Sequence, residues 1–489
     1  MIHSRASLRR LIRRNWRHSL FVLVSNREPY IHTHSESGTR VIRPASGMAL
    51  AVDPIMQASG GLWVAHGSGD ADRKVCDADG CVRVPPQAPA YTLKRVWLTE
   101  EQEDGYYYGF SNAALWPLCH IAYRRPVFEQ THWQMYREVN ELFAESVAEE
   151  IGDRPAFVFI QDYHLALLPR LLKQRCPKAL IAHFWHIPWP NPEVFRICPW
   201  RLELLDGLLG SDILGFHIRY HCNNFIDTVD RELEARPDRE MTAVVYGGKT
   251  TKIRAFPISI DSEAVAWAAA RRPVTLLMRQ LRQQYRLPAR NIGIGVDRLD
   301  YTKGIPERLR AIDRFLERYP DYIGDFTFIQ AGVPSRTRVE EYQRLNDEVD
   351  AAVEQINRKY GGDDWVPIIY LKQHLDPPAL YALYRLARFC LVSSLQDGMN
   401  LVAKEFVAAN IEEDGVLLLS QFTGAARQLR EALAINPYAV DEVAERIYQA
   451  LTMEEREVRL RLRRLRESVR VNNVYKWATD IIQKLSKLA

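Results

Sequence analysis

Residues 156–190 read AFVFIQDYHLALLPRLLKQRCPKALIAHFWHIPWP. The stretch begins with an apolar run at 156–161, continues with helical periodicity over 165–174, and returns to an apolar run at 180–185. Short runs that are apolar throughout are typical of strands buried on both faces, and a helix between two of them is typical of a βαβ unit. This stretch therefore predicts an α/β fold with a parallel sheet.

The same alternation extends in both directions along the chain. Further apolar runs of this first series predict strands at 21–25, 62–66 and 213–217, with a long helix at 127–151. A second series predicts strands at 291–296, 325–330, 366–371, 388–392 and 415–420, and helices at 306–319, 338–360 and 400–409. Two such series predict two doubly wound, Rossmann-like domains that face each other across a cleft, followed by C-terminal helices.

The predicted domain boundaries follow from these two series. We expect a basic extension at 1–19, an N-terminal domain at 20–262, a connection at 263–289, a C-terminal domain at 290–460 and helices at 461–489. The extension carries Arg5, Arg9, Arg10, Arg13, Arg14 and Arg17. It fits two interpretations, a solvated or loosely docked extension and a basic amphipathic helix at a membrane surface.

The composition excludes several classes of protein. Apolar residues make up 47% and charged residues 26% of the 489 residues, which argues against intrinsic disorder. Lys and Arg (65) nearly balance Asp and Glu (61), so nucleic-acid binding is not expected. No apolar run approaches the ~20 residues that span a bilayer, and the run at 21–24 is too short for a signal peptide. With seven cysteines we expect a cytoplasmic protein with reduced thiols, and homo-oligomerisation is left open.

The familiar cofactor motifs are incomplete. Gly67-Ser68-Gly69 lacks the third glycine of a dinucleotide fingerprint, and the segment 247–250 lacks the first glycine of a phosphate loop. His217 and His221 could share a helix face as metal ligands, but no third ligand follows at a recognisable spacing. We therefore expect neither a cofactor nor a metal ion.

Polar residues follow the predicted strands of the first series, where α/β proteins bind ligands. Arg27 offers a fork of donors that suits a phosphate, although taken alone this position favours an ordinary surface arginine. Asp162 could accept hydrogen bonds from sugar hydroxyls or act as a base. His186 begins a loop, 186–190, that two prolines make rigid. A histidine satisfied within the core is the alternative for that position.

The second series carries a group of cations at its strand ends. Arg298 and Lys303, five residues apart after the strand at 291–296, would converge on an anion the size of a diphosphate. Arg298 could instead pair only with Asp300. Arg336 is a third cation that follows a strand.

A further polar segment, 397–405, follows the strand at 388–392. Gly398 allows a ligand to approach the backbone closely, and the helix that begins here offers N–H groups to it. Asp397 opens the segment, and Glu405 could bind a ribose diol. Anion-binding groups in both predicted domains suggest a nucleotide-sugar donor and a phosphorylated acceptor.

These motifs resemble the trehalose-6-phosphate synthase family of retaining glycosyltransferases, which have two facing Rossmann-like domains. The resemblance rests on FSNAALWP (110–117), the loop at 186–190, RLDYTKG (298–304) and DGMNLVAKE (397–405). It implies that one of the C-terminal helices crosses back to the first domain. It also implies glucosyl transfer from UDP-glucose to glucose 6-phosphate, giving trehalose 6-phosphate and UDP.

The resemblance further implies roles for individual residues. The acceptor phosphate would be bound by Arg27, Tyr107, Trp116 and Arg336, with Asp162 on the acceptor hydroxyls. Arg298 and Lys303 would neutralise the donor diphosphate, His186 and Asp397 would hold the transferred glucose, and Gly47 would approach the donor. The nucleotide would be contacted by Leu375, Gly398, Met399, Asn400, Leu401, Val402, Ala403, Lys404 and Glu405. Departure would occur on the front face, with the leaving phosphate taking the acceptor proton and without a metal ion.

Several positions depart from the family pattern. They are Ser46-Gly47, where the family often has two glycines, Trp189 and Leu375, where it often has phenylalanine, and a longer loop at 28–43. These positions leave open another phosphorylated acceptor, such as glycerol 3-phosphate. A catalytically silent sugar-phosphate sensor is a third hypothesis.

Overall fold

The computed structural model describes residues 3–16, 19–36, 38–44, 47–336 and 338–488. The chain divides into two compact units. Unit 1 consists of Met1–Ile258 and Val474–Ala489, and unit 2 consists of Ser259–Asn473. The segment expected as a connection, 263–289, forms two helices that lie in unit 2.

Unit 1 is built on a ten-stranded sheet in the order β10-β11-β12-β9-β8-β7-β1-β4-β6-β5. Its strands are β1 (Leu20–Arg27), β4 (Leu62–His66), β5 (Cys81–Val84), β6 (Tyr91–Val96), β7 (Ala156–Gln161), β8 (Leu180–Phe184), β9 (Ile213–Phe216), β10 (Arg236–Asp238), β11 (Ala243–Tyr246) and β12 (Lys249–Ala255). The seven strands from β12 to β6 are parallel to one another, and β5, β10 and β11 pair antiparallel at the edges. A separate hairpin, β2 (Ile31–Ser35) and β3 (Gly38–Ile42), follows β1.

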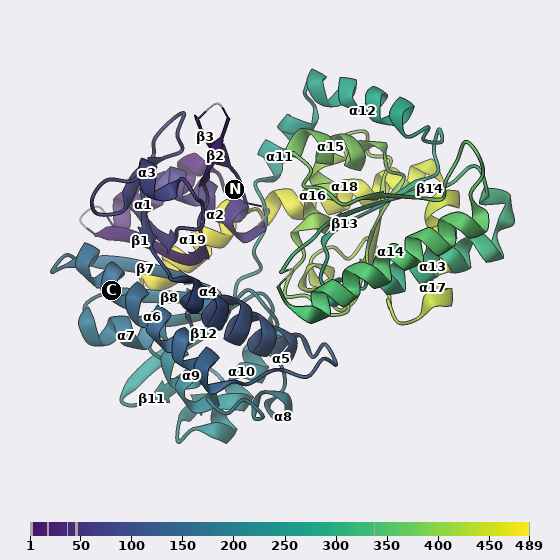
Figure 1. Ribbon diagram of the computed structural model, residues 1–489. Coiled ribbons are helices and arrows are strands. Elements are labelled where there is room, and N and C mark those ends of the chain that lie inside the picture. Colours follow the sequence, from purple (N-terminus) through teal and green to yellow (C-terminus); the bar gives the residue numbers. More distant parts are fainter. Residues whose placement is uncertain (1–2, 17–18, 37, 45–46, 337, 489) are drawn as a thin grey trace. The chain divides into compact units, whose positions relative to one another are not determined.

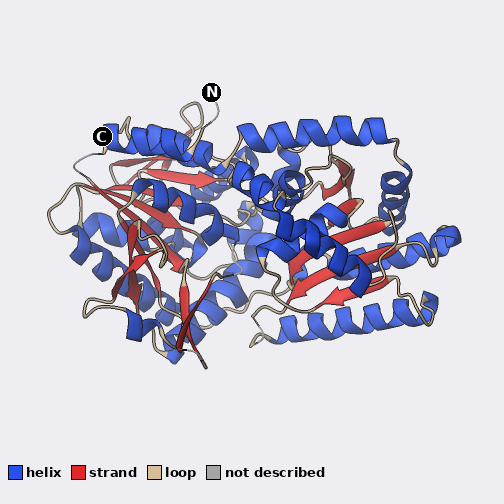
Figure 2. Cartoon of the chain, turned by 90° about the horizontal axis from the view of Figure 1, so that it is seen from above, coloured by secondary structure: helices blue, strands red, loops and turns tan. Residues whose placement is uncertain are grey.

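Helices lie on both faces of this sheet (Figure 2). On one side, α1 (Arg5–Asn15), α2 (Gly47–Ser59) and α19 (Val474–Leu485) pack on one another, and α19 also contacts β8. On the other side lie α6 (Gln130–Ile151), α7 (Leu168–Arg175) and α9 (Arg201–Leu208). The remaining helices of unit 1 are α3 (Asp72–Val75), α4 (Glu100–Glu103), the π-helix η1 (Asp104–Leu115), α5 (Trp116–His120), the 3₁₀ turn η2 (Tyr163–Leu165), α8 (Pro192–Phe195) and α10 (Arg219–Glu232).

Unit 2 has a six-stranded, fully parallel sheet in the order β15-β14-β13-β16-β17-β18. The strands are β13 (Ile292–Arg298), β14 (Thr327–Val333), β15 (Ile368–Leu371), β16 (Phe389–Val392), β17 (Val416–Ser420) and β18 (Leu433–Ile435). Figure 1 places α13 (Ile305–Arg318), α14 (Glu340–Tyr360) and α17 (Val440–Thr452) on one face, and α15 (Pro377–Leu386), α16 (Leu401–Ala409) and α18 (Glu455–Val471) on the other. The unit also contains α11 (Ser262–Ala269), α12 (Arg272–Gln284), η3 (Tyr301–Lys303), η4 (Pro320–Tyr322) and η5 (Gly424–Arg427).

Each of the two large sheets has one topological switch point, where the order of the parallel strands reverses. In unit 2 the strand order is that of a Rossmann fold, and the chain reverses its direction of winding between β13 and β16. In unit 1 the parallel strands follow the same order, with the reversal between β1 and β7. Ligands of such sheets bind outside the carboxyl ends of the strands at the switch point. Arg27 and Arg298 are the last residues of β1 and β13, and Asp162 and Asp397 lie in the segments that follow β7 and β16.

The N-terminal extension differs from the solvated or loosely docked segment that we expected. Residues 5–15 form the amphipathic helix α1, in which Leu8 and Ile12 are buried against unit 1. Arg9 Nε donates to the carbonyl oxygen of Ala58 at the end of α2, at 3.2 Å. Because the apolar face of α1 is already covered, it is not available to enter a membrane. Arg17 lies outside the described residues.

Several strands were not predicted from the sequence. Among them are β6 and β12, whose sequences YTLKRV and KTTKIRA mix polar and apolar residues. His217 does not share a helix face with His221, because α10 begins only at Arg219.

Among the described residues, no helix is both long and apolar enough to cross a membrane.

Candidate functional site

The unit 1 site begins at the end of β1. Arg27 Nη2 donates to Tyr107 Oη, and the guanidinium carbon lies 5.0 Å from the centroid of the Tyr107 ring. Tyr107 belongs to the π-helix η1, an uncommon element that occurs frequently at functional sites. Its ring also stacks on His164, with centroids 5.7 Å apart and an interplanar angle of 10°. The arginine and the tyrosine are therefore held together before any ligand binds.

A hydrogen-bonded chain connects this pair to the next predicted residues. Asn112 Nδ2 donates to the carbonyl oxygen of Tyr107 at 2.7 Å, and Tyr163 Oη donates to Asn112 Oδ1 at 2.8 Å. Trp116 lies beside Tyr163, with ring centroids 5.8 Å apart. The structure thus brings Arg27, Tyr107, Trp116 and the Asp162 loop into one cluster. Asn112 and Tyr163 were not singled out from the sequence, although both lie in or next to motifs that were.

Asp162 connects this cluster to the loop at 186–190. Its Oδ1 accepts hydrogen bonds from the backbone N–H groups of Tyr163 at 2.9 Å and His186 at 3.1 Å. Its backbone has φ 74°, a left-handed conformation that costs a non-glycine residue free energy and is common in functional loops. The carboxylate is therefore fixed at the carboxyl end of β7.

His186 is only partly exposed, and its surroundings keep it uncharged. Burial lowers its pKa well below the usual value, and the nearby His217 and His183 lower it further. Its Nε2 lies 2.9 Å from Gln161 Oε1. A neutral ring that donates from Nε2 keeps Nδ1 as an acceptor for a ligand hydroxyl.

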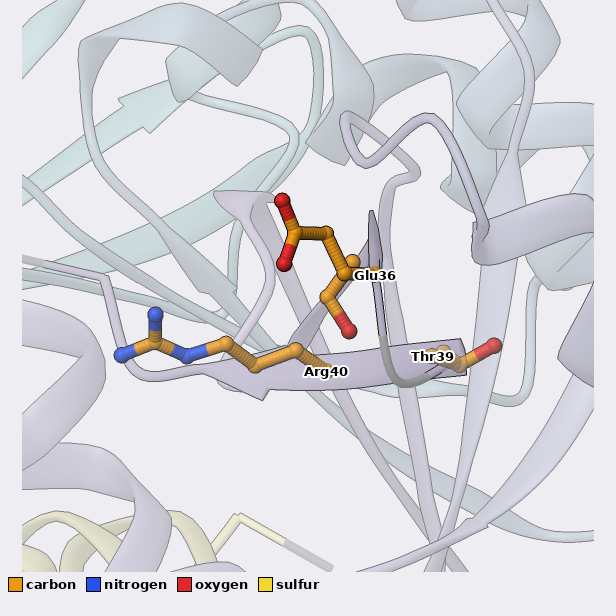
Figure 3. Close-up of a pocket in the computed structure, with 4 residues that line it drawn as sticks. Glu36, Thr39 and Arg40 are labelled. Carbon is orange, nitrogen blue, oxygen red and sulfur yellow. The ribbon is translucent and has the colours of Figure 1, made fainter.

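Gly47, the remaining predicted residue of unit 1, is the exposed first residue of α2. Its neighbour Ser46, one of the departures from the family pattern, lies outside the described residues. The longer loop at 28–43 forms the β2–β3 hairpin. That hairpin has a surface pocket of about 500 Å³ lined by Ser35, Glu36, Thr39 and Arg40 (Figure 3). These four side chains are exposed and belong to none of the polar clusters at the strand ends.

The unit 2 site is centred on an ion pair at the switch point. Lys303 Nζ lies 2.6 Å from Asp397 Oδ2, and the two side chains are only 13% and 14% exposed. The same carboxylate oxygen accepts hydrogen bonds from Ser394 Oγ at 3.2 Å and Asn400 Nδ2 at 3.3 Å. Arg298 is the last residue of β13, immediately before this turn. The structure therefore brings together two predicted residues that are far apart in the sequence, Lys303 and Asp397.

The ion pair can form because the turn after β13 lies close to the end of β16. Gly304 has φ 61°, and a Cβ atom there would lie 2.3 Å from the carbonyl oxygen of Ser393. Only glycine fits, so the turn after β13 can lie directly against the end of β16. Beneath it, the buried Arg308 donates to Ser393 Oγ at 3.0 Å and to Asp297 Oδ2 at 2.6 Å. This network fixes both strand ends.

Arg336 belongs to unit 2, whereas the other predicted acceptor residues belong to unit 1. Its side chain is 3% exposed, and its Nη1 lies 3.2 Å from Asp300 Oδ2. Burial opposes the ionisation of Asp300, but Arg336, Arg298 and Lys303 outweigh it and lower the pKa of Asp300 to about 2. All three predicted cations thus interact electrostatically with the ionised Asp300. The role of Arg336 toward an acceptor stays a prediction.

The segment 397–405 enters helix α16. Asn400 Oδ1 caps this helix by accepting from the Ala403 N–H at 3.0 Å. Burial raises the pKa of Glu405 to about 7 and lowers the pKa of Lys404 to about 7. Lys404 Nζ donates to Gln428 Oε1 at 2.7 Å. The other predicted nucleotide contacts lie in the loop after β15 and in or just before α16; they are Leu375, Gly398, Met399, Leu401, Val402 and Ala403.

Comparison with known proteins identifies the family. The model of glycosyltransferase family 20 matches residues 19–487. The chain belongs to this family. It is 37% identical over 475 residues to a trehalose-6-phosphate synthase of Mycolicibacterium smegmatis, covering 95% of this chain and 92% of that protein.

The chain is also similar to two further members of glycosyltransferase family 20. A bifunctional trehalose-6-phosphate synthase/phosphatase of Thermoproteus tenax is 38% identical, and the match covers 95% of this chain but only 63% of that protein. A crystal structure of a UDP-forming α,α-trehalose-phosphate synthase from Burkholderia xenovorans, in complex with glucose 6-phosphate, superposes with a TM-score of 0.84. It is 30% identical, and the match covers 95% of this chain and 99% of that one.

These matches confirm the family that the sequence motifs suggested and the α/β fold with two Rossmann-like domains. The family 20 chain is a glycosyltransferase. Among the described residues, no group of three or more His, Cys, Asp or Glu side chains is arranged to hold a metal ion.

Proposed function

We propose that this glycosyltransferase moves the glucosyl group of UDP-glucose to glucose 6-phosphate, with retention, to give α,α-trehalose 6-phosphate and UDP. The observation that carries this proposal is the ion pair between Lys303 and Asp397 at the switch point of unit 2, where Arg298 ends the neighbouring strand β13. Cations at such a point suit a diphosphate, and a carboxylate beside them suits a sugar hydroxyl. Similarity to trehalose-6-phosphate synthases over 95% of the chain supports the same reaction.

In the proposed donor site, Arg298 and Lys303 bind the diphosphate. The ion pair between Lys303 and Asp397 keeps the lysine in place without a ligand, so little reorganisation is needed when the phosphate binds. Asp397 and His186 accept hydrogen bonds from the glucosyl hydroxyls. Glu405 accepts hydrogen bonds from the ribose.

In the proposed acceptor site, Arg27 and Tyr107 bind the phosphate of glucose 6-phosphate, and Trp116 packs against the sugar. Asp162 accepts hydrogen bonds from the sugar hydroxyls. Two backbone N–H groups already fix the orientation of its carboxylate. Arg336 is proposed as a further phosphate ligand.

The proposed transfer takes place on one face of the glucosyl ring. The bond between the anomeric carbon and the diphosphate oxygen breaks, and the acceptor oxygen attacks from the side on which the phosphate leaves. The acceptor proton passes to the departing phosphate. Arg298 and Lys303 stabilise the negative charge that grows on the diphosphate, the role that a metal ion has in other phosphate sites. The transfer is proposed to need no metal ion.

We also propose a cytoplasmic location, because all seven cysteines are free thiols.

The acceptor is tested by measuring UDP release from UDP-glucose with glucose 6-phosphate, fructose 6-phosphate, mannose 6-phosphate or glycerol 3-phosphate. We expect release with glucose 6-phosphate, and a non-reducing disaccharide phosphate whose proton spectrum has two α-anomeric signals. Release only with glycerol 3-phosphate would replace the acceptor while keeping the donor site. No release with any acceptor, together with tight binding of glucose 6-phosphate, would favour a sugar-phosphate sensor.

A further inference from the structure

The imidazole of His186 is enclosed by aromatic side chains. The Phe184 ring lies 4.7 Å from it and the His217 ring 5.4 Å from it, centroid to centroid. The third neighbour is Trp477, at 6.3 Å and an interplanar angle of 49°. Phe184 precedes His186 on the same strand exit, whereas Trp477 comes from α19, almost 300 residues later in the chain.

Trp477 is itself held by aromatic contacts. Its indole is 2% exposed and packs edge-on against Phe184, with centroids 5.0 Å apart, and against Phe159 of β7 at 5.4 Å. Helix α19 contributes a continuous apolar face to unit 1, so the indole cannot turn away without undocking the helix. The side chain that braces His186 is therefore supplied by the end of the chain.

Packing alone does not explain an indole at this position. Trp477 Nε1 is buried and has no hydrogen-bond partner among the described residues. A buried N–H without an acceptor lowers stability, and a smaller aromatic ring would avoid that cost. The indole therefore contributes its size and shape, and not a hydrogen bond, to the packing around His186.

We propose that Trp477 is a positioning residue for the glycosyl transfer: together with Phe184 and His217, which also contact the His186 ring, it holds that ring in the orientation that binds the glucosyl group of the donor. This inference rests on the proposed role of His186. Trp477 itself contacts no substrate. Its effect should therefore appear in reactions of the glucosyl group and not in the affinity for the nucleotide.

The test is a double-mutant cycle between Trp477→Leu and His186→Ala. We expect Trp477→Leu to lower kcat/KM for UDP-glucose about tenfold, within the range of coupling between contacting residues, with an unchanged inhibition constant for UDP. In the His186→Ala background the same change should cause no further loss. Trp477→Phe, which keeps an aromatic ring, should recover most of the activity.

Leu485→Ala is the matched control, because it removes a buried apolar side chain from the same helix. It should lower the thermal midpoint and leave kcat/KM within twofold. If Trp477→Leu does not fold, Trp477→Met takes its place in the cycle. Equal losses from Leu485→Ala and Trp477→Leu would overturn the proposal, as would independent, multiplicative losses in the cycle. If His186→Ala alone has no effect, the proposed role of His186 is wrong, and the inference fails with it.

Discussion

At the scale of single residues, Arg27 illustrates how the structure adds to the sequence. The sequence allowed a phosphate ligand or an ordinary surface arginine, and the structure pairs the guanidinium with Tyr107 at a switch point. We expect Arg27→Ala to raise the KM for glucose 6-phosphate by about 10- to 100-fold, the usual cost of losing a charged hydrogen bond. The KM for UDP-glucose should stay within threefold.

The control for this prediction is Arg40→Ala, which removes an exposed arginine of the nearby hairpin. Initial rates across a matrix of both substrates separate the two KM values. If the KM for glucose 6-phosphate is the same in the Arg27 and Arg40 variants, Arg27 does not bind the acceptor phosphate.

Glu405 carries a prediction about pH. Burial raises its pKa to about 7, although the nearby Tyr384 hydroxyl partly opposes the shift. A carboxylate accepts two ribose hydroxyls better than a carboxylic acid does, so the KM for UDP-glucose should fall up to about tenfold between pH 6 and pH 8. Saturating glucose 6-phosphate keeps the ionisation of the acceptor out of the measurement. Glu405→Gln should give a high KM without this pH dependence, and a persisting dependence would exclude Glu405 as its source.

At the scale of elements, α1 docks on unit 1 although its sequence is rich in arginine. Six arginines suggested solvation or a membrane surface, but Leu8 and Ile12 at i and i+4 are enough to dock the helix on α2 and α19. We expect Leu8→Ala to lower the free energy of unfolding by about 2–4 kcal/mol in urea titrations. Arg10→Ala, on the exposed face, should change it by less than about 0.5 kcal/mol. Equal effects of the two variants would mean that α1 does not dock in solution.

Most strands and their polar exits could be predicted from the sequence, because buried parallel strands are apolar throughout and turn residues bound them. Several elements that were not predicted have a mixed pattern, such as β12, or unusual hydrogen bonding, such as the π-helix η1. The site residues at strand exits were found in the same way. Contacts such as Lys303 with Asp397, or Arg336 with Asp300, join segments far apart in the chain, and no local pattern carries that information.

At the scale of the whole molecule, buried histidines should make the fold sensitive to acid. Burial lowers the pKa of His66 to about 4, of His183 to about 3 and of His221 to about 4, whereas each would have its ordinary value near 6.5 in the unfolded chain. Below pH ~6.5 the unfolded chain binds protons that the native protein does not. Each histidine then reduces stability by at most about 1.4 kcal/mol per pH unit.

The urea midpoint should therefore be stable above pH 7 and fall from pH 6.5 to pH 5. His183→Leu should flatten this slope, whereas replacing the exposed His34 with Gln should not. An acid slope that His183→Leu leaves unchanged would contradict the burial of His183.

The switch point of unit 2 is proposed to bind the donor diphosphate. Turnover and ligand binding of Arg298→Ala test it most directly, with circular dichroism to establish that the fold is intact. We predict a rate reduced by about 10²–10³, weakened binding of UDP in calorimetry, and unchanged binding of glucose 6-phosphate. A folded Arg298→Ala protein that binds UDP and turns over like the parent would contradict the account.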